Sequence, residues 1–214
     1  MTLSRFKYPR TRHFNFSPGI GSDDKIITNY SRFEGQEVIG TIKMDGENTS
    51  LYSDGYVHAR SMDGVHHPSR DWVKKFWSER SYLLPTGYRV CGENMYARHS
   101  LCYNDLDSYF YGFSVWDNHN RCLAWDDTLY YFQELGITPV QEVYRGTFDL
   151  NFIRNLCEKL DIDKVEGIVI RLVRDIPSHW FDTCVAKYVR KGHVQTDKHW
   201  AHQEIIHNSL KKPI

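Results

Sequence analysis

The sequence predicts an α+β fold with mainly antiparallel sheets, in one domain that covers residues 1–214. Three observations support this prediction. The expected strands come as hairpins with helical segments inserted between them, which is the order typical of α+β proteins. Six Trp, fourteen Tyr and eleven Phe are ample for a sizeable core. No repeat, low-complexity tract or linker rich in Pro, Gly or Ser divides the chain.

Eight segments have the β-branched or alternating apolar character of strands. Asp54-Gly55 lies between two of them and is a typical hairpin turn. The expected strands are residues 38–44, 49–53, 56–60, 88–95, 109–116, 140–144, 166–173 and 184–190.

Four segments have helical periodicity instead. The first follows Pro68, where Ser69 and Asp71 are both candidate N-caps. The second ends at Gly136, since glycine commonly terminates helices. The expected helices are residues 68–82, 126–135, 150–160 and 197–210, the last of which would close the fold.

The net charge is zero, because Lys+Arg and Asp+Glu both total 27, so no global field marks a nucleic-acid binder. The two ends are nevertheless basic. No acid occurs among the first twelve residues, and the last stretch has only Asp197 and Glu204. These ends suit a local contact with a polyanion, and solvated basic termini are an equally good interpretation. The basic residues concerned are Arg5, Lys7, Arg10, Arg12, Lys187, Arg190, Lys191, Lys198, Lys211 and Lys212.

The five cysteines are widely spaced and form no CxxC pair, which argues against a zinc ribbon and a disulfide framework. The basic first residues are not followed by the apolar run of a signal peptide. No apolar stretch approaches the roughly 20 residues that a membrane helix needs. We therefore expect a reducing, soluble compartment and no membrane partner.

The segment most informative about chemistry is Lys43-Met44-Asp45-Gly46-Glu47-Asn48, between two expected strands. A lysine amine has an ordinary pKa of about 10.4 and is protonated near neutral pH. A nucleophilic lysine must therefore lie among other cations or out of water. Cations and carboxylates should then occur at the ends of other strands.

Four later segments supply such residues. They are His58-Ala59-Arg60-Ser61, Val90-Cys91-Gly92-Glu93-Asn94, Val165-Glu166-Gly167-Ile168-Val169-Ile170 and Val185-Ala186-Lys187-Tyr188-Val189-Arg190-Lys191. With the first segment, this order resembles the covalent nucleotidyltransferase superfamily of polynucleotide ligases and mRNA capping enzymes. An asparagine two residues beyond K-x-D-G makes the chain similar to ATP-dependent RNA ligases of the phage and RNA-editing type. The resemblance extends from about residue 40 to 191.

The resemblance implies a nucleotidyltransferase (ATP-grasp-like) domain of antiparallel sheets with flanking helices. It also implies an ATP-dependent RNA ligase that joins 5′-phosphate and 3′-hydroxyl RNA ends, through lysyl-AMP and AMP-RNA intermediates. Mg²⁺ or Mn²⁺ would be required. A small ligase of this kind would suit a bacteriophage or a bacterium, with the protein in the cytoplasm of the cell or host.

The resemblance assigns the first group of site residues as follows. Lys43 would attack the α-phosphorus of ATP and hold AMP. Asp45 would position the ribose or the lysine turn, and Gly46 would let the backbone approach the nucleotide. Asn48 would hold a metal-bound water, and Arg60 would contact the ribose or the phosphates.

The second group comes from the later motifs. Glu93 would bind the ribose hydroxyls, and Glu93 and Glu166 offer the oxygen ligands that Mg²⁺ prefers. Phe113 would stack on the adenine, with Tyr111 as the competing residue. Lys187 would contact the α-phosphate and supply positive charge in the transition state.

One departure concerns the last motif. The family commonly has K-x-K, and here Val189 occupies the second lysine position. Along a strand Lys187 and Lys191 share a face while Arg190 points away, so we predict Lys191 as the second catalytic cation. A β-bulge would favour Arg190 instead.

A second departure is length. Only 23 residues follow Lys191, too few for the oligonucleotide-binding (OB) barrel or the helical domain that many relatives append. We therefore expect the basic N-terminal arm and the helix at 197–210 to contribute to RNA binding, and the chain to be a monomer.

Three other functions remain open. A capping guanylyltransferase uses the same lysine chemistry with GTP, and a DNA ligase would seal nicks whose 3′-hydroxyl strand is DNA. From another class, a non-catalytic nucleotide- or RNA-binding module could keep the fold. It would have no need of a nucleophilic lysine.

Overall fold

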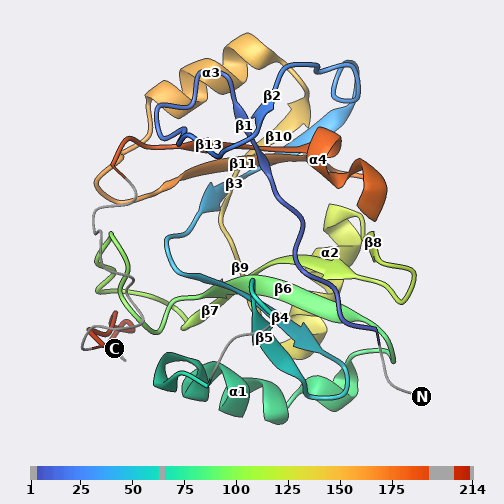
Figure 1. Ribbon diagram of the computed structural model, residues 1–214, viewed down its shortest axis with the longest axis vertical. Helices are drawn as coiled ribbons and strands as arrows, with labels where there is room; N and C mark the ends of the chain where they lie inside the picture. Colours follow the sequence, from blue (N-terminus) through green and yellow to red (C-terminus); the bar gives the residue numbers. More distant parts are fainter. Residues whose placement is uncertain (1–3, 63–65, 193–204, 213–214) are drawn as a thin grey trace.

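The computed structural model describes residues 4–62, 66–192 and 205–212. Two β-sheets face each other, and each is covered on its outer side by helices (Figure 1). We call them the first sheet and the second sheet. The chain crosses from one to the other at residues 44–46, directly after Lys43.

The first sheet has six strands and is antiparallel except where β1 joins it. β1 pairs in parallel with β13 and with β2. The order is β10 (Glu142–Thr147), β3 (Glu37–Lys43), β11 (Gly167–Leu172), β13 (Val185–Val189), β1 (Arg12–Phe14) and β2 (Ile26–Ile27).

The second sheet has seven strands, and its central pairs are antiparallel. Its order is β12 (Ile176–Pro177), β8 (Arg121–Cys122), β7 (Phe110–Trp116), β6 (Arg89–Asn94), β4 (Glu47–Tyr52) and β5 (Val57–Ala59), with β9 (Thr138–Pro139) parallel to β7. The β4–β5 hairpin turns at Gly55, which has a φ of +84° that favours glycine.

The helices cover the outer faces through short apolar stripes. In α1 (Asp71–Ser78), Val73 and Trp77 are buried four residues apart, as one helical face requires. α2 (Trp125–Leu135) packs on the same sheet and ends at Gly136 with a φ of +61°. α3 (Leu150–Glu158) covers the first sheet, and the Asp149 carboxylate caps it by accepting two backbone N–H groups. The remaining short helices are α4 (Phe181–Cys184) and the 3₁₀ turns η1 (Pro68–Arg70), η2 (Ser81–Leu83) and η3 (Ser178–Trp180).

Three predictions are corrected. Residues 197–204 of the helix expected at 197–210 lie outside the described residues, but residues 205–210 are not helical. Instead His207 and Leu210 form isolated bridges with Ala97 and Leu106, because the Asn208 amide binds backbone groups of that loop. The expected strand at 140–144 is β10, displaced towards 142–147.

The third correction concerns the start of the first helix. Neither Ser69 nor Asp71 caps it. The N-cap of α1 is Arg70, without a side-chain hydrogen bond, and His67 caps the preceding 3₁₀ turn. Within the described ranges, every helix is too short or too polar to cross a membrane.

The N-terminal segment, residues 4–11, joins the two sheets before β1 begins (Figure 1). The Phe6 backbone exchanges hydrogen bonds with the Tyr52 hydroxyl of β4, with N–H to Oη at 2.8 Å. Tyr8 packs edge-on against Phe113 and Phe181, with ring centroids 5.2 and 5.4 Å away. The segment therefore forms one wall of the space between the sheets.

Candidate active site

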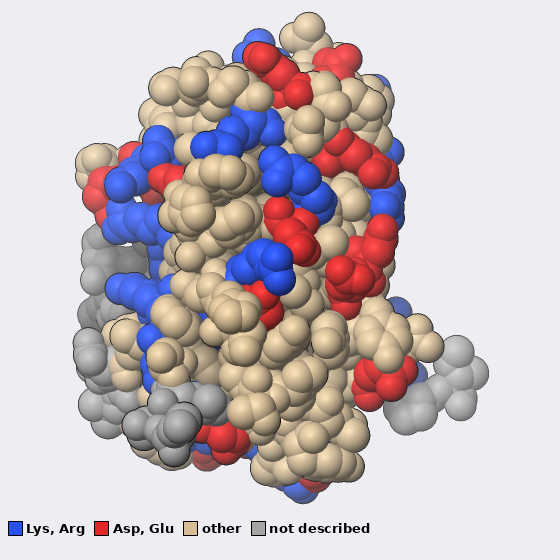
Figure 2. Space-filling view, turned by 90° about the vertical axis from the view of Figure 1, so that its right-hand side faces the viewer, with Lys and Arg blue, Asp and Glu red and all other residues tan. Residues whose placement is uncertain are grey.

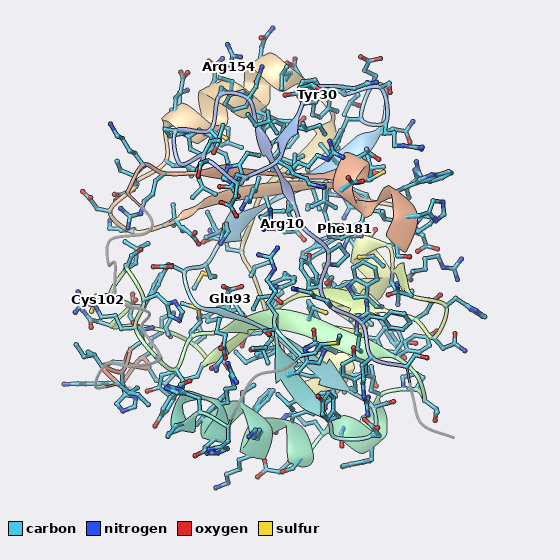
Figure 3. The ribbon with its side chains drawn as sticks, in the orientation of Figure 1. Arg10, Tyr30, Glu93, Cys102, Arg154 and Phe181 are labelled. Carbon is cyan, nitrogen blue, oxygen red and sulfur yellow. The ribbon has the colours of Figure 1, made fainter. Side chains whose placement is uncertain are left out.

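A cavity of about 600 Å³ lies between the sheets and is lined by both. This is the size of a typical small-molecule site. One part of the lining is apolar and the rest is charged. In Figure 3, Glu93 and Arg10 are labelled beside the gap between the sheets, Glu93 on the second sheet and Arg10 near the first. The sequence-predicted residues in the lining are Lys43, Gly46, Asn48, Arg60, Glu93, Phe113, Glu166 and Lys187.

Lys43 is the last residue of β3 and lies opposite Gly167 at the start of β11. This register brings the preceding residue, Glu166, beside the lysine, and the Lys43 Nζ donates a hydrogen bond to the Glu166 carboxylate. Glu166 is buried, with an exposed fraction of 5%. The pairing of β3 with β11 thus brings together Lys43 of the first motif and Glu166 of the fourth.

The environment of Lys43 corrects the electrostatic expectation. Burial lowers its pKa, but Glu166, Glu93 and Asp45 act in the opposite direction, and the net pKa lies above the ordinary lysine value. The three carboxylates therefore outweigh burial, which is the opposite of the predicted crowding by cations. Lys43 is therefore held as an ammonium until its surroundings change.

Glu93 faces Lys43 from the second sheet. It pairs with Asn48 across β6 and β4 and accepts a hydrogen bond from the Gly46 N–H, with N to Oε1 at 3.3 Å. Burial raises the Glu93 pKa to about 7, Lys43 lowers it and Glu166 raises it. A carboxyl with this pKa gains from a nearby cation, because a cation favours the ionised form.

Lys187 lies on β13, two strands from β3. It stands in one cross-strand row with Val169 and Thr41. Burial lowers the Lys187 pKa and Lys43 lowers it further, while Asp24, whose Oδ1 is 3.9 Å from Nζ, opposes the shift. The last motif thus supplies a cation to the same cavity as Lys43.

Asp45 is buried and lies outside the cavity lining. Its Oδ2 accepts hydrogen bonds from the Ser100 N–H at 2.8 Å, the Ser100 hydroxyl at 2.7 Å and the Leu101 N–H at 2.7 Å. Of the two predicted roles, the geometry supports positioning of the lysine turn and not contact with a ribose.

Gly46 is required for packing between strands. A Cβ at this position would lie 2.6 Å from the Asn94 carbonyl oxygen and 2.8 Å from the Met95 sulfur. The glycine therefore lets the turn after Lys43 approach β6. This reason differs from the predicted close approach to a nucleotide, although Gly46 also lines the cavity.

Asn48 and Arg60 line the cavity from β4 and from the end of β5. The Asn48 Oδ1 is buried and has no hydrogen-bond partner within the described part of the chain. A buried unpaired amide oxygen is costly, so it favours a bound donor, water or cation. Arg60 is exposed, at the rim.

The apolar part of the lining contains one of the two aromatic residues that the resemblance offered for the adenine. Phe113 lines the cavity, together with Val140, Val169 and Phe181. Tyr111 does not line the cavity, and its hydroxyl accepts the Asp107 N–H at 2.9 Å. A bulge at Cys91–Gly92 shifts the register of β7 here.

The second cation of the last motif is corrected. β13 ends at Val189, so the alternation that would have aimed Lys191 at the cavity stops before it, and Lys191 is exposed. Arg190 is buried, and its Nη2 donates to the Ser100 hydroxyl at 3.1 Å. Ser100 in turn binds Asp45, so Arg190 supports the lysine turn from behind the cavity.

Several lining residues were missed by sequence reasoning. Arg70 makes a bidentate ion pair with Glu47, with Nε to Oε2 at 2.7 Å. Arg171 is buried and donates to the Leu123 carbonyl at 2.6 Å. Arg10 and Lys25 come from the N-terminal region, before the first motif. Glu47 lies directly after K-x-D-G, and Arg10 belongs to the basic N-terminal arm, but no motif pointed to Lys25, Arg70 or Arg171.

The model of the RNA ligase family matches residues 36–189. The chain belongs to the RNA ligase family. This match covers the same stretch as the five motifs and confirms the sequence-based resemblance. No protein with a curated description matches the sequence significantly.

Solved ligase structures have the same fold as this RNA ligase family member. An archaeal ATP-dependent RNA ligase is 16% identical, with a TM-score of 0.57, over 86% of this chain and 48% of the other. A putative ATP-dependent DNA ligase from Aquifex aeolicus is 17% identical, with a TM-score of 0.59, over 87% and 50%. A Naegleria gruberi RNA ligase mutant with ATP and Mn is 15% identical, with a TM-score of 0.55, over 86% and 56%.

These matches confirm the predicted α+β nucleotidyltransferase-like ligase fold, with mixed sheets and few helices. The chain spans about half the length of the solved ligases that it matches.

Proposed function

We propose that this chain catalyses ATP-dependent ligation of RNA, joining 5′-phosphate to 3′-hydroxyl ends through lysyl-AMP and AMP-RNA intermediates. The observation that carries the proposal is the position of Lys43. Its amine lies in the cavity between two sheets, in contact with Glu166 and near Glu93, and Lys187 lines the same cavity. Membership of the RNA ligase family supports the same reaction.

ATP suits the cavity because the two parts of the lining match the two parts of a nucleotide. Phe113, Phe181 and Val169 offer an apolar surface for a purine base. The charged part, with Lys43 and Lys187, suits phosphates.

The first step would transfer AMP to Lys43. The amine attacks the α-phosphorus, a P–N bond forms, and the bond from that phosphorus to the bridging oxygen breaks, so that pyrophosphate leaves with the electron pair. Lys43 must first lose a proton, and Glu166 is the carboxylate in contact that can accept it. Lys187 would stabilise charge on the phosphate oxygens.

A divalent cation, Mg²⁺ or Mn²⁺, fits the oxygen groups near Lys43. Asn48 has an unpaired buried Oδ1, and Glu93 and Glu166 are buried carboxylates. No three His, Cys, Asp or Glu side chains of the described residues gather to hold a metal. Mg²⁺ commonly binds one or two carboxylates and keeps water and substrate phosphates as further ligands. When bound, such a cation would neutralise phosphate charge and favour the uncharged Lys43 amine.

The RNA contact is proposed to be local. Figure 2 shows Lys and Arg interspersed with Asp and Glu over one face, without one continuous basic field. On this face, and with a net charge of zero, a few phosphate contacts near the cavity suit the binding of RNA ends. We further propose a monomer in the cytoplasm, which agrees with five free cysteines.

The deciding experiment uses ATP labelled at the α-phosphate, with Mg²⁺ or Mn²⁺, followed by a denaturing gel. Wild type should retain the label, and Lys43→Ala should lose it. Lys164→Ala is the matched control, because Lys164 is exposed and pairs only with Asp161 among the described residues. Labelled GTP in a parallel reaction tests the capping alternative.

Sealing assays then test the substrate. RNA with a 5′-phosphate and a 3′-hydroxyl should be joined, while a nick with an all-DNA 3′-hydroxyl strand should not. Guanylylation without adenylylation, or label that persists in Lys43→Ala, would contradict the proposal. Tight ATP binding without label would favour a non-catalytic nucleotide-binding module.

A further inference from the structure

Two cations of the cavity lining, Arg10 and Lys25, have no part in the five motifs. Arg10 belongs to the segment before β1, and Lys25 directly precedes β2. Both strands lie at the end of the first sheet remote from β3, which carries Lys43. Both cations therefore come from elements that are separated from Lys43 along the sheet by β11 and β13, although all three residues line the cavity.

The strand order arranges the charges by distance from Lys43. β13, with Lys187, is two strands from β3, β1 is three strands away and β2 is four. With about 4.8 Å between neighbouring strands, these positions lie roughly 10, 14 and 19 Å from β3 along the sheet. Lysine and arginine side chains then extend into the cavity, so the gaps between the charged groups are smaller.

Hydrogen bonds hold the backbone of Lys25 and the side chain of Arg10 in place. The Lys25 carbonyl accepts the His13 N–H at 2.7 Å, which holds the loop before β2 against β1. Arg10 donates from Nη1 to the Asp23 carbonyl at 2.9 Å and from Nη2 to the Asp23 Oδ2 at 3.3 Å. These bonds use two of the five N–H donors of the guanidinium.

The remaining donors are available for a ligand. In the part of the chain that the structure describes, Lys25 makes no ion pair, and Arg10 pairs only with Asp23. The side chain of Arg10 is 53% exposed, so this end of the cavity opens to solvent. The Lys25 ammonium and the Arg10 donors that Asp23 does not use therefore suit an anionic group that binds at this open end.

Asp24 is the carboxylate that could oppose such binding. Its Oδ2 is 3.3 Å from the His13 Nε2, and its Oδ1 is 3.9 Å from the Lys187 Nζ. It thus faces groups on β1 and β13. Asp23 is likewise held by Arg10.

In-line displacement places the leaving group opposite the attacking nitrogen. With Lys43 at one end of the polar lining, the leaving pyrophosphate must point towards the other end. We propose that Arg10 and Lys25 bind the β- and γ-phosphates of ATP and stabilise the pyrophosphate as its bond to the α-phosphorus breaks. This inference rests on the proposed function for its reaction, but its binding component can be tested without catalysis.

The test compares ATP with AMP. Equilibrium binding of each nucleotide is measured in a Lys43→Ala background, with and without Arg10→Ala and Lys25→Ala. Each substitution should weaken ATP binding roughly tenfold and leave AMP binding unchanged, because a charge-assisted hydrogen bond is lost only with the longer nucleotide. Lys25→Arg should retain ATP binding.

Lys7→Ala is the matched control, since Lys7 lies in the same N-terminal segment but is exposed and outside the lining. Equal binding of ATP by the variants and their background, or an equal loss for ATP and AMP, would overturn the inference. Lys25→Ala keeps the test informative if Arg10→Ala unfolds the N-terminal segment.

A catalytic assay separates the two proposals. If the enzyme forms lysyl-AMP, both variants should slow that step and the reverse reaction with pyrophosphate, yet seal RNA that was adenylylated beforehand at the wild-type rate. Loss of sealing by the same factor would overturn the inference and indicate a structural defect. Absence of lysyl-AMP in wild type, with ATP binding still weakened selectively, would refute the proposed reaction and leave the phosphate site standing.

Discussion

Two lysines of the polar lining, Lys43 and Lys187, have opposite electrostatic surroundings. Lys43 lies among Glu166, Glu93 and Asp45, and its pKa is above the ordinary value. Lys187, two strands away on β13, is half-buried near Lys43 and Arg60, and its pKa is below the ordinary value. Two lysines of one sheet thus respond to their surroundings in opposite directions. The comparison teaches that neighbouring carboxylates favour the charged form of Lys43, whereas burial and a neighbouring lysine disfavour the charged form of Lys187.

Loss of the Lys187 charge should have the largest effect, and this effect should be on the rate of lysyl-AMP formation. Lys187→Ala removes the charge that would stabilise the reacting phosphate, and lysyl-AMP formation should fall about 10²- to 10³-fold. Lys187→Arg should recover part of the rate, because it keeps the charge. Single-turnover labelling at saturating ATP measures this, and a rate within threefold of wild type, roughly 0.7 kcal/mol, would remove Lys187 from the proposed chemistry.

The hydrogen bonds that hold Asp45, one of the carboxylates near Lys43, should contribute to the stability of the fold. Asp45→Asn would weaken the charge-assisted bonds to Ser100 and Leu101, and we expect the free energy of unfolding to fall by about 2–3 kcal/mol. Denaturant titration measures it. Asp126→Asn is the control, since the Asp126–Arg145 pair is exposed and should contribute less than about 1 kcal/mol. Equal effects of the two substitutions would contradict the assigned role of Asp45.

Removing Glu166, the ion-pair partner of Lys43, should bring the pKa of Lys43 closer to that of Lys187. Glu166→Gln takes away a charge that raises the Lys43 pKa, so a larger fraction of the amine is uncharged at pH 8. Lys43 should react about tenfold faster with an amine-selective acylating reagent, which corresponds to about one pKa unit. Peptide mapping by mass spectrometry follows the modification, with Lys164 as an internal exposed reference. A slower reaction at Lys43 would show that Glu166 does not hold the ammonium form.

The smallest effect is expected from Glu93 through the pH dependence of stability. Its pKa rises from an ordinary 4.5 to about 7 on folding, so between these values the folded protein binds more protons than the unfolded chain. The Glu93 contribution to stability therefore decreases as pH rises through this window. Glu93→Gln should be about 1 kcal/mol more stable than wild type at pH 8, after allowing for the lost attraction to Lys43, and the gain should vanish near pH 4.5. Urea titrations at both pH values test the sign, and a gain confined to low pH would contradict it.

The sequence was a good guide wherever local pattern and motif spacing carry the information. The β4–β5 hairpin follows from Asp54-Gly55, and the end of α2 follows from Gly136, because both depend on a few neighbouring residues. The motif order also named the residues that meet in the cavity, including Lys43, Glu93, Glu166 and Lys187.

It was a poor guide where distant segments compete for the same groups. A helix was predicted over 197–210, yet in its described part, residues 205–210, Asn208 binds the backbone of the loop near Met95 and the chain is not helical. Lys191 has the right spacing from Lys187, but β13 stops at Val189. Neither outcome could be read from local periodicity, since each depends on contacts with residues far along the chain.

The sequence by itself determined most of the longer strands and helices, the family and most of the residues that gather around Lys43, because turn chemistry, periodicity and motif spacing are local properties. Only the tertiary structure decided the electrostatic state of that lysine and the membership of the far end of the cavity. The pairing of Gly167 with Lys43 brings Glu166 to the amine, and the addition of β1 and β2 at the sheet edge brings in Arg10 and Lys25. Charges interact through space, so their effects follow from which strands become neighbours and not from their order in the chain.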